Sequence, residues 1–480
     1  MAADILDLDA TDQLAALAGK RISAVELLQA SLAREAETHG RLNAVVTKDP
    51  DRAFTRAEAI DDLRAKGASL GVLAGLPMTI KDTFDVAGMP ATSGLQAFKD
   101  RTADDARVAA QAKAAGAVIW GKTNVPVMAG DWQSFNDLYG ASNNPWDVTR
   151  TTGGSSGGAA CALASGVTAL EIGSDIGGSL RVPASFCGVF SHKPTWGLVS
   201  QLGHVPPAPG ARAARDLNVI GPMARSARDL RLLLGVISET PSAGLGGAAD
   251  LSSLKVGLWL DEPLYPLDPE VRGVMEGLAS ALAGQGATVE PIASPVPVGQ
   301  LMAAYQLLLG SVIATDLPPA QRAEMARMRG LANFPEGFGE TLSPELGLLR
   351  AHTATHAEWL EADEIRTRLR ESLSETFARF DVILAPVSAV PAFPHDHQPF
   401  GARTLRASEG VEIPYVSMLN WIALATACHL PATCVPAGLT AKGLPVGAQI
   451  IGPRGADATT LAVAQAIDEN IRRFVAPPRG

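Results

Sequence analysis

Residues 151–188 read TTGGSSGGAACALASGVTALEIGSDIGGSLRVPASFCG. The stretch contains two glycine-rich turns, GGSSGG at 153–158 and IGGS at 176–179, and each presents serines on backbone that only glycine permits. The residues between the turns, 159–164, are small and suit a closely packed helix. We therefore expect this part of the fold to bring a serine of one turn beside a serine of the other.

A phosphate-binding loop is one alternative interpretation of these glycines. A Walker loop requires a lysine, then serine or threonine, directly after its last glycine, but alanine follows GGSSGG. A dinucleotide-binding fingerprint requires GxGxxG at the start of a helix, with an acidic residue about twenty positions later, and that spacing is not met. A pair of purely structural glycine turns stays open at this point.

The composition narrows the functional classes. Of the 480 residues, 47% are hydrophobic and 19% are charged, which predicts a folded globular protein. The net charge of −10 and the lack of a basic stripe argue against nucleic-acid binding. The N-terminus carries acids where a secretory signal is basic, and the uncharged stretch after Arg150 lacks the large apolar residues of a membrane span. We expect a cytoplasmic protein without membrane contact, and a homodimer stays open.

From about residue 63 onward, short apolar runs alternate with alanine-rich stretches. The runs predict buried strands in GVLAGLPMTIKD, AAGAVIWGKTN, KVGLWLDEP, DVILAPVS and LPATCVPAG. Residues 104–115, 356–380 and 456–470 predict helices. This alternation favours an α/β fold, in which helices cover both faces of a β-sheet. Residues 11–40 predict helices only, one of which begins at a capping box formed by Ser23 and Glu26.

We expect neither a disulfide framework nor a metal site. The four cysteines are scattered, form no CxxC pair and are expected to be small buried side chains: Cys161, Cys187, Cys428 and Cys434. His352 and His356 lie at helical i, i+4 spacing, but the glutamate that follows the first histidine of a zinc-protease helix is absent.

A hydrolase with a serine nucleophile needs a base, which is most often histidine. Neither serine turn contains a GxSxG elbow, so the α/β-hydrolase arrangement has no support. Lys81 ends an apolar run, where burial would desolvate its ammonium and lower its pKa toward that of a usable base. A structural lysine paired with Asp82 or Asp85 is the alternative.

Five segments, in this order, resemble the amidase signature enzymes. They are GLPMTIKDTFDVAGMPATSG, NNPWDVTRTTGGSSGG, GSDIGGSLRVPASFCGVFSHKPTWG, DVILAPVSAVPAF and LPATCVPAGLTAKGLPVGAQIIG, and the resemblance covers roughly residues 65–470. It implies an amidohydrolase with a central mixed β-sheet, a small-molecule amide as substrate and no cofactor. We expect an N-terminal helical segment, 1–62, and a catalytic domain, 63–480.

The resemblance also implies a role for each matching residue. Ser179 is the expected nucleophile, Ser155 the proton relay and Lys81 the base, so that an acyl-enzyme forms on Ser179. A cis peptide bond is expected between Gly154 and Ser155. The expected oxyanion hole consists of the backbone amides of Ile176, Gly177, Gly178 and Ser179, and the expected supporting pair is Asp175 with Arg181.

Two positions depart from the family pattern. SHKPT replaces GLKPT at 191–195, and His429 stands where glycine is expected, so that a role for His429 as general base stays open. Residues 421–425, with Trp132, Phe135 and Tyr139, suggest an apolar or aryl acyl pocket, but core packing explains each equally well.

Two other functions stay open. The glutamine-hydrolysing A subunit of a tRNA-dependent amidotransferase resembles the same family, although residues 203–223 depart from the pattern of that enzyme. A non-catalytic binding module on the same scaffold is disfavoured because Lys81, Ser155 and Ser179 are all present. The choice among amides, anilides and carbamates is not decided by these motifs.

Overall fold

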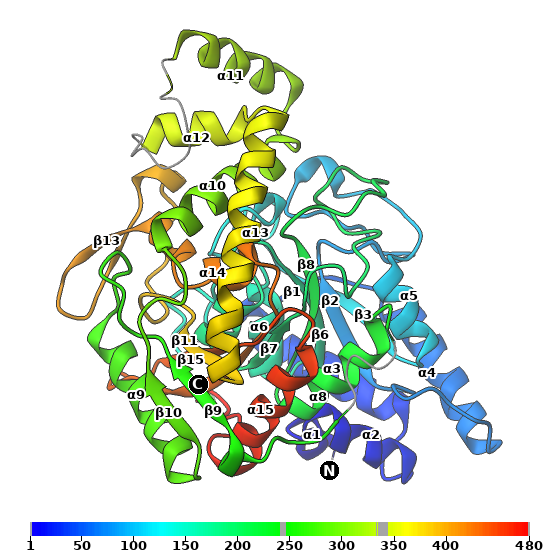
Figure 1. Ribbon diagram of the computed structural model, residues 1–480. Coiled ribbons are helices and arrows are strands. Elements are labelled where there is room, and N and C mark those ends of the chain that lie inside the picture. Colours follow the sequence, from blue (N-terminus) through cyan, green and yellow to red (C-terminus); the bar gives the residue numbers. More distant parts are fainter. Residues whose placement is uncertain (1, 241–245, 333, 335–343, 479–480) are drawn as a thin grey trace.

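The computed structural model describes residues 2–240, 246–332, 334 and 344–478 (Figure 1). An eight-stranded mixed sheet forms its centre. The order across it is β10 (Thr288–Pro291), β9 (Lys255–Leu258), β11 (Val382–Pro386), β15 (Pro445–Ile451), β14 (Ala432–Leu439), β7 (Phe190–Lys193), β8 (Val219–Ala224) and β6 (Leu170–Asp175). β10, β9 and β11 are parallel, and the other neighbours are antiparallel. The α/β class and the mixed sheet are therefore confirmed.

A smaller sheet lies beside the large one. Its order is β1 (Val45–Lys48), β3 (Val118–Thr123) and β2 (Pro77–Lys81), with β2 parallel and β1 antiparallel to β3. Side chains join its edge strand β2 to the edge strand β6: the Thr79 amide donates to Thr168 Oγ1 at 3.3 Å, and Thr79 Oγ1 donates to Glu171 Oε1 at 2.6 Å. The C-terminal end of β2, with Lys81, consequently lies next to β6.

Helices cover both faces of the large sheet. Thr433 on β14 contacts Thr460 of α15 (Asp457–Asn470), whereas the next residue, Cys434, lies on the other face near Ser185 of α7 (Arg181–Cys187). Beside α15 pack α8 (Ala227–Ile237) and α9 (Pro269–Gly284), and beside α7 packs α6 (Gly157–Ala164). α6 consists of glycine, alanine, cysteine and leucine, and all of its residues are buried, as the small-residue pattern predicts.

The N-terminal segment contains helices and one strand. The helices are α1 (Ala2–Leu6), α2 (Ala10–Ala18), α3 (Ala24–Leu42) and α4 (Pro50–Ala65). The predicted capping box of Ser23 and Glu26 begins α3, and Asn43 ends it in a left-handed conformation with φ 48°. β1 follows and joins the smaller sheet, a strand that sequence analysis did not predict. The buried side chains of this segment belong to the same hydrophobic core as those of β2 and β3.

The remaining helices are α5 (Arg107–Ala114), α10 (Val298–Ala314), α11 (Pro319–Leu331), α12 (Pro344–His352), α13 (His356–Arg379) and α14 (Ala423–Ala427). Figure 1 shows α11 and α12 at the far end of the molecule from α1 and α2. His352 and His356 lie on different helices, because α12 ends at His352 and α13 begins at His356, the residue at which the sequence predicts a helix to start. Two short pairs complete the strands: β4 (Phe135–Asn136) with β5 (Gly140–Ala141), and β12 (Thr404–Arg406) with β13 (Glu412–Pro414). Among the described residues, no helix is both long and apolar enough to cross a membrane.

Candidate active site

Lys81 is the last residue of β2, and its side chain is fully buried. Its Nζ donates to Ser155 Oγ at 2.7 Å and to Ser174 Oγ at 2.8 Å. Burial lowers the pKa of Lys81 to about 7, and the charge of Asp175, together with that of Glu171 when this carboxyl is ionised, opposes that shift. The amine is therefore close to its deprotonation point at neutral pH and already contacts a serine hydroxyl.

The first glycine turn holds Ser155 against Lys81. The Gly154–Ser155 peptide bond is cis, as expected from the sequence. A Cβ atom at Gly154 would lie 2.5 Å from the carbonyl oxygen of Asp131, so only glycine fits there. Ser134 joins the two ends of the turn, because its hydroxyl donates to the Gly153 carbonyl at 3.1 Å and accepts from the Gly157 amide at 3.0 Å.

The second glycine turn connects β6 to α7 and carries Ser179, which is 6% exposed. The amide of Ser156 donates to the carbonyl of Ser179 at 3.3 Å, so the two turns meet as the sequence predicts. Gly178 has φ 90°, a conformation that favours glycine. No hydrogen bond joins the Ser155 and Ser179 hydroxyls, both of which belong to the described chain; Lys81 holds Ser155 instead.

The side chains of Asp175 and Arg181 support the second turn through hydrogen bonds. Both are fully buried, and Asp175 accepts two hydrogen bonds from the Arg181 guanidinium. The same carboxylate accepts from the amides of Gly178 at 2.9 Å and Leu180 at 3.0 Å. Arg181 lowers the pKa of Asp175 against the effect of burial, so the carboxylate stays ionised. The amide of Gly178 is thus already engaged.

The other expected oxyanion donors are unengaged. Within the described chain, no protein acceptor binds the amides of Ile176, Gly177 and Ser179. These three N–H groups, two in the turn and one on Ser179 itself, are free to donate to a ligand. Of the four amides in the expected oxyanion hole, Gly178 differs because its donor is turned toward Asp175.

Two further ionisable side chains lie near Lys81. Burial raises the pKa of Glu171 to about 8, which keeps its carboxyl neutral at neutral pH. Burial, together with the charge of Lys81, lowers the pKa of His204 to about 3, so its ring is neutral as well. At pH 7, therefore, His204 adds no positive charge beside the amine, and the carboxyl of Glu171 adds a full negative charge only above about pH 8.

The aromatic residues that the sequence suggests for an acyl pocket do not all lie in one place. Trp132 contacts the second glycine turn, because its Nε1 donates to the Gly177 carbonyl at 2.7 Å. Phe135 stacks on His397, and the hydroxyl of Tyr139 lies 3.4 Å from that of Thr47. Trp421 packs in the core against Trp259 and Tyr265.

His429 is engaged in an ionic network. Its Nε2 lies 2.7 Å from Asp216 Oδ1, its Nδ1 lies 2.8 Å from Arg370, and its ring stacks on Trp196. Burial lowers its pKa to about 4. Its φ of 59° explains why glycine is the expected residue at this position. None of its hydrogen bonds within the described chain reaches the two glycine turns.

Two residues of the site were missed by sequence analysis. Ser174 binds Lys81, and its place directly before Asp175 in GSDIGGS was the available signal. Tyr305 on α10 donates from its hydroxyl to the Ile176 carbonyl at 2.8 Å. No sequence motif surrounds Tyr305, and only the folding of α10 against the turn brings it there.

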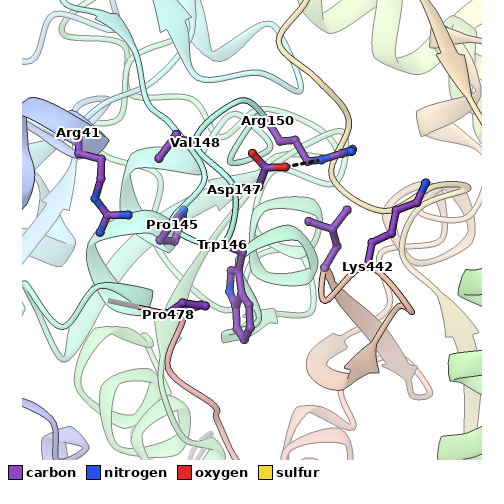
Figure 2. Close-up of a pocket in the computed structure, with 9 residues that line it drawn as sticks. Arg41, Pro145, Trp146, Asp147, Val148, Arg150, Lys442 and Pro478 are labelled. Carbon is purple, nitrogen blue, oxygen red and sulfur yellow. Dashed lines mark hydrogen bonds and ion pairs between the residues drawn. The ribbon is translucent and has the colours of Figure 1, made fainter. Parts of the chain in front are cut away.

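The four cysteines are buried and free, as expected. The described residues contain no cluster of three or more histidine, cysteine or acidic side chains that could hold a metal ion. A cavity of about 560 Å³ lies elsewhere, lined by Arg41, Pro145, Trp146, Asp147, Val148, Arg150, Lys442, Leu444 and Pro478 (Figure 2). Arg150 forms an ion pair with Asp147 at its wall, and its lining includes none of Lys81, Ser155 and Ser179.

Comparison with known proteins shows the family of the chain. The family model described as Amidase matches residues 26–461. The A subunit of glutamyl-tRNA(Gln) amidotransferase from Anaeromyxobacter dehalogenans (strain 2CP-C) is 33% identical, over 97% of this chain and 96% of the relative. A bacterial aryl acylamidase of the amidase signature family has a TM-score of 0.80 at 25% identity, over 97% of this chain and 96% of that one. 6-Aminohexanoate cyclic dimer hydrolase, solved with its substrate, has a TM-score of 0.76 at 26% identity, over 98% and 99%. The chain is therefore an amidase, and it belongs to the amidase signature family.

Proposed function

We propose that this amidase cleaves its substrate through an acyl-enzyme on Ser179, with Ser155 as proton relay and Lys81 as base. The observation that carries the proposal is the 2.7 Å hydrogen bond from Lys81 Nζ to Ser155 Oγ, made by a buried lysine whose pKa is about 7. A neutral amine accepts a proton from Ser155, and Ser155 accepts one from Ser179 as it attacks the amide carbon. The Ser179 hydroxyl must turn toward Ser155 for this step.

The remaining steps reverse the proton path. The C–N bond of the tetrahedral intermediate breaks, and the proton returns from Lys81 through Ser155 to the leaving amine. Water then attacks the acyl-enzyme and gives a proton to the same relay; the bond between Ser179 Oγ and the acyl carbon breaks, the proton returns through Ser155 to Ser179, and the acid is released. The oxyanion of both intermediates would accept hydrogen bonds from the free amides of Ile176, Gly177 and Ser179. Gly178 is not needed as a donor, because its amide serves Asp175.

The substrate class that we propose is an amide with an apolar or aryl acyl group, or a carbamate of similar shape. Apolar side chains surround the second turn: Trp132 binds Gly177, and Leu419 and Ile422 lie within van der Waals distance of where side chains at Gly177 and Gly178 would begin. Similarity to a bacterial aryl acylamidase supports the same class. A panel of anilides, alkyl amides and carbamates on the purified chain would rank the candidates.

Covalent labelling tests the assignment of the nucleophile. A serine-directed phosphonofluoridate should add one phosphonyl group to the chain, and peptide mass analysis should locate it on Ser179. Preincubation with the best substrate of the panel should slow the labelling. Label on Ser155, or complete resistance of an active preparation, would contradict the proposal.

Glutamine hydrolysis is a second candidate function, because the A subunit of glutamyl-tRNA(Gln) amidotransferase is 33% identical over 97% of this chain. In that case glutamine would acylate Ser179 and release ammonia, and partner proteins would take part in the reaction. Ammonia release from glutamine by the isolated chain, compared with its turnover of anilides, separates the two functions. Turnover of anilides without glutaminase activity would eliminate the second.

A further inference from the structure

The catalytic turn contains two consecutive peptide planes that are held in different ways. The plane between Gly177 and Gly178 is fixed at both ends: its carbonyl accepts from Trp132 Nε1 at 2.7 Å, and its N–H donates to Asp175 at 2.9 Å. The plane between Ile176 and Gly177 is fixed at its carbonyl alone, by the hydroxyl of Tyr305 at 2.8 Å. Its N–H, on Gly177, has no protein acceptor within the described chain.

The carbonyl and the N–H of a trans peptide point in opposite directions, so fixing one sets the direction of the other. Glycine populates backbone conformations that are closed to other residues, so the peptide plane that precedes Gly177 can rotate more freely. A hydrogen bond to this plane is therefore needed to fix its direction. Without its hydroxyl partner, the Ile176 carbonyl has no protein donor in the described chain, and the Gly177 N–H loses its fixed direction.

We propose that Tyr305 is a positioning residue for the oxyanion hole: by binding the Ile176 carbonyl, it aims the Gly177 N–H at the oxyanion that forms during attack by Ser179. This inference rests on the proposed acyl-enzyme function and adds a residue to it. Tyr305 is fully buried and comes from α10, a helix that carries no other residue of the site. Burial raises the pKa of the Tyr305 hydroxyl, so it remains a donor throughout the working pH range.

Trp132 acts on the neighbouring plane and is expected to have the weaker effect. Its loss leaves the Gly178 N–H bound to Asp175, whose carboxylate is itself held by Arg181. The two aromatic residues therefore differ in a way that mutagenesis can measure, although both donate to carbonyls of the same turn.

The test compares Tyr305→Phe with a matched control, Tyr265→Phe. Tyr265 is also buried among aromatic side chains, but its hydroxyl has no hydrogen-bond partner among the described residues. Tyr305→Phe should lower kcat/KM about tenfold, as expected for one hydrogen bond, and the loss should fall on kcat rather than KM. Trp132→Phe should lower kcat less, and Tyr265→Phe should leave it within about twofold.

Binding of a transition-state analogue distinguishes positioning from packing. An aryl trifluoromethyl ketone forms a hemiketal with a serine nucleophile and places an oxyanion in the hole, whereas the matching carboxylate product does not form that adduct. In Tyr305→Phe the inhibition constant of the ketone should rise about tenfold, in parallel with the loss of kcat/KM, while that of the carboxylate stays constant.

Either of two results with a folded Tyr305→Phe enzyme would overturn the proposal. The first is unchanged ketone affinity and kcat in a folded Tyr305→Phe enzyme, and the second is an equal loss of affinity for ketone and carboxylate, which would make Tyr305 part of the pocket wall. If Tyr305→Phe unfolds, Tyr305→His, which can still donate a hydrogen bond, must restore selectivity for the ketone over the carboxylate, and its failure to do so would also overturn the proposal. Phosphonofluoridate labelling of Ser179 in the wild-type enzyme runs alongside, so that failure of the nucleophile assignment is recognised separately.

Discussion

The two faces of the smaller sheet each bury a lysine, and the two lysines have different partners. In the register of β2 against β3, Lys81 is level with Thr123, and Ile80 is level with Lys122. Because side chains alternate along a strand, Lys81 and Lys122 lie on opposite faces of this sheet. Both amines are fully buried, and burial lowers the pKa of each.

Their contacts distinguish the proposed base, Lys81, from a structural cation, Lys122. Lys122 Nζ lies 3.1 Å from Asp82 Oδ1 and donates to the carbonyls of Phe84 and Pro90. Lys81 instead contacts the hydroxyls of Ser155 and Ser174, with no carboxylate at ion-pair distance among the described residues. Burial alone therefore does not make a lysine a base. The buried neighbours decide whether its proton stays or can be exchanged with a nucleophile.

The strongest test of the site on the Lys81 face, the face of the smaller sheet that carries Lys81, is Ser179→Ala. The substitution removes the proposed nucleophile, so turnover should fall on the order of 10⁴-fold or more. Because only one hydroxyl is lost, the melting temperature should stay close to that of the wild type. Initial rates on the best panel substrate and a thermal melt measure both quantities. Substantial residual turnover by this variant would place the covalent step on another residue.

Substitution of the two lysines should separate activity from stability. Lys81→Arg keeps a buried cation that cannot lose its proton, so turnover should fall about 10²- to 10⁴-fold with the fold retained. Lys122→Met leaves Asp82 buried without its partner, which should lower the free energy of unfolding by about 3–5 kcal/mol.

The readouts for this pair are urea unfolding and kcat per folded molecule. Lys122→Met should keep most of its kcat wherever it is folded, since its amine points away from the serines. Near-wild-type turnover in Lys81→Arg would contradict the mechanism in which a neutral lysine is the base. If folded Lys122→Met lost as much kcat as is expected for Lys81→Arg, the two faces of the sheet would not differ in function.

The pH dependence follows from the Lys81 pKa of about 7. The base works in its deprotonated form, and the deprotonated fraction grows as pH rises through that value. Below pH 7, kcat/KM should therefore fall about tenfold per pH unit, and above it the rate should level off. Rate profiles between pH 5 and 9 measure this. A rate that is flat from pH 5 to pH 7, or that falls as the pH rises through 7, would exclude Lys81 as the titrating base.

Much of the Lys81 face could be predicted from sequence, because its parts are local. The two glycine turns and the end of β2 are short motifs in which spacing and small residues predict that serines of the two turns meet, and the family resemblance of these motifs singles out Lys81, Ser155 and Ser179 among their residues. Contacts that cross long stretches of chain could not be predicted. Tyr305 contacts the turn from α10, which lies in a region without regular sequence patterning. The strand β1 could not be predicted either, because the elements before and after it in the sequence are helices.

The use of the Gly178 amide could not be predicted either. The motif IGGS predicts four donors, but the direction of each N–H depends on Asp175 and on the aromatic residues that bind the carbonyls. Backbone direction within a glycine turn is decided by its surroundings, since the glycines themselves permit several conformations.

The smallest expected effect sharpens the comparison between the two buried acids, Glu171 on the Lys81 face and Asp82 beside Lys122. Burial raises the pKa of Glu171 to about 8, so its carboxyl is neutral at pH 7, where it accepts a hydrogen bond from Thr79 at 2.6 Å. Glu171→Gln supplies a neutral amide of the same shape that can accept the same bond. Turnover at pH 7 should change by less than about threefold, and stability should change little.

Asp82→Asn should instead be strongly destabilising, because it removes the carboxylate that lies 3.1 Å from Lys122. Above pH 8 the wild-type carboxyl of Glu171 ionises and its charge favours the ammonium form of Lys81, so Glu171→Gln should be at least as active as the wild type at pH 9. A large loss of turnover at pH 7 in folded Glu171→Gln would mean that the carboxylate is ionised, and that both lysines rely on a buried counter-charge after all.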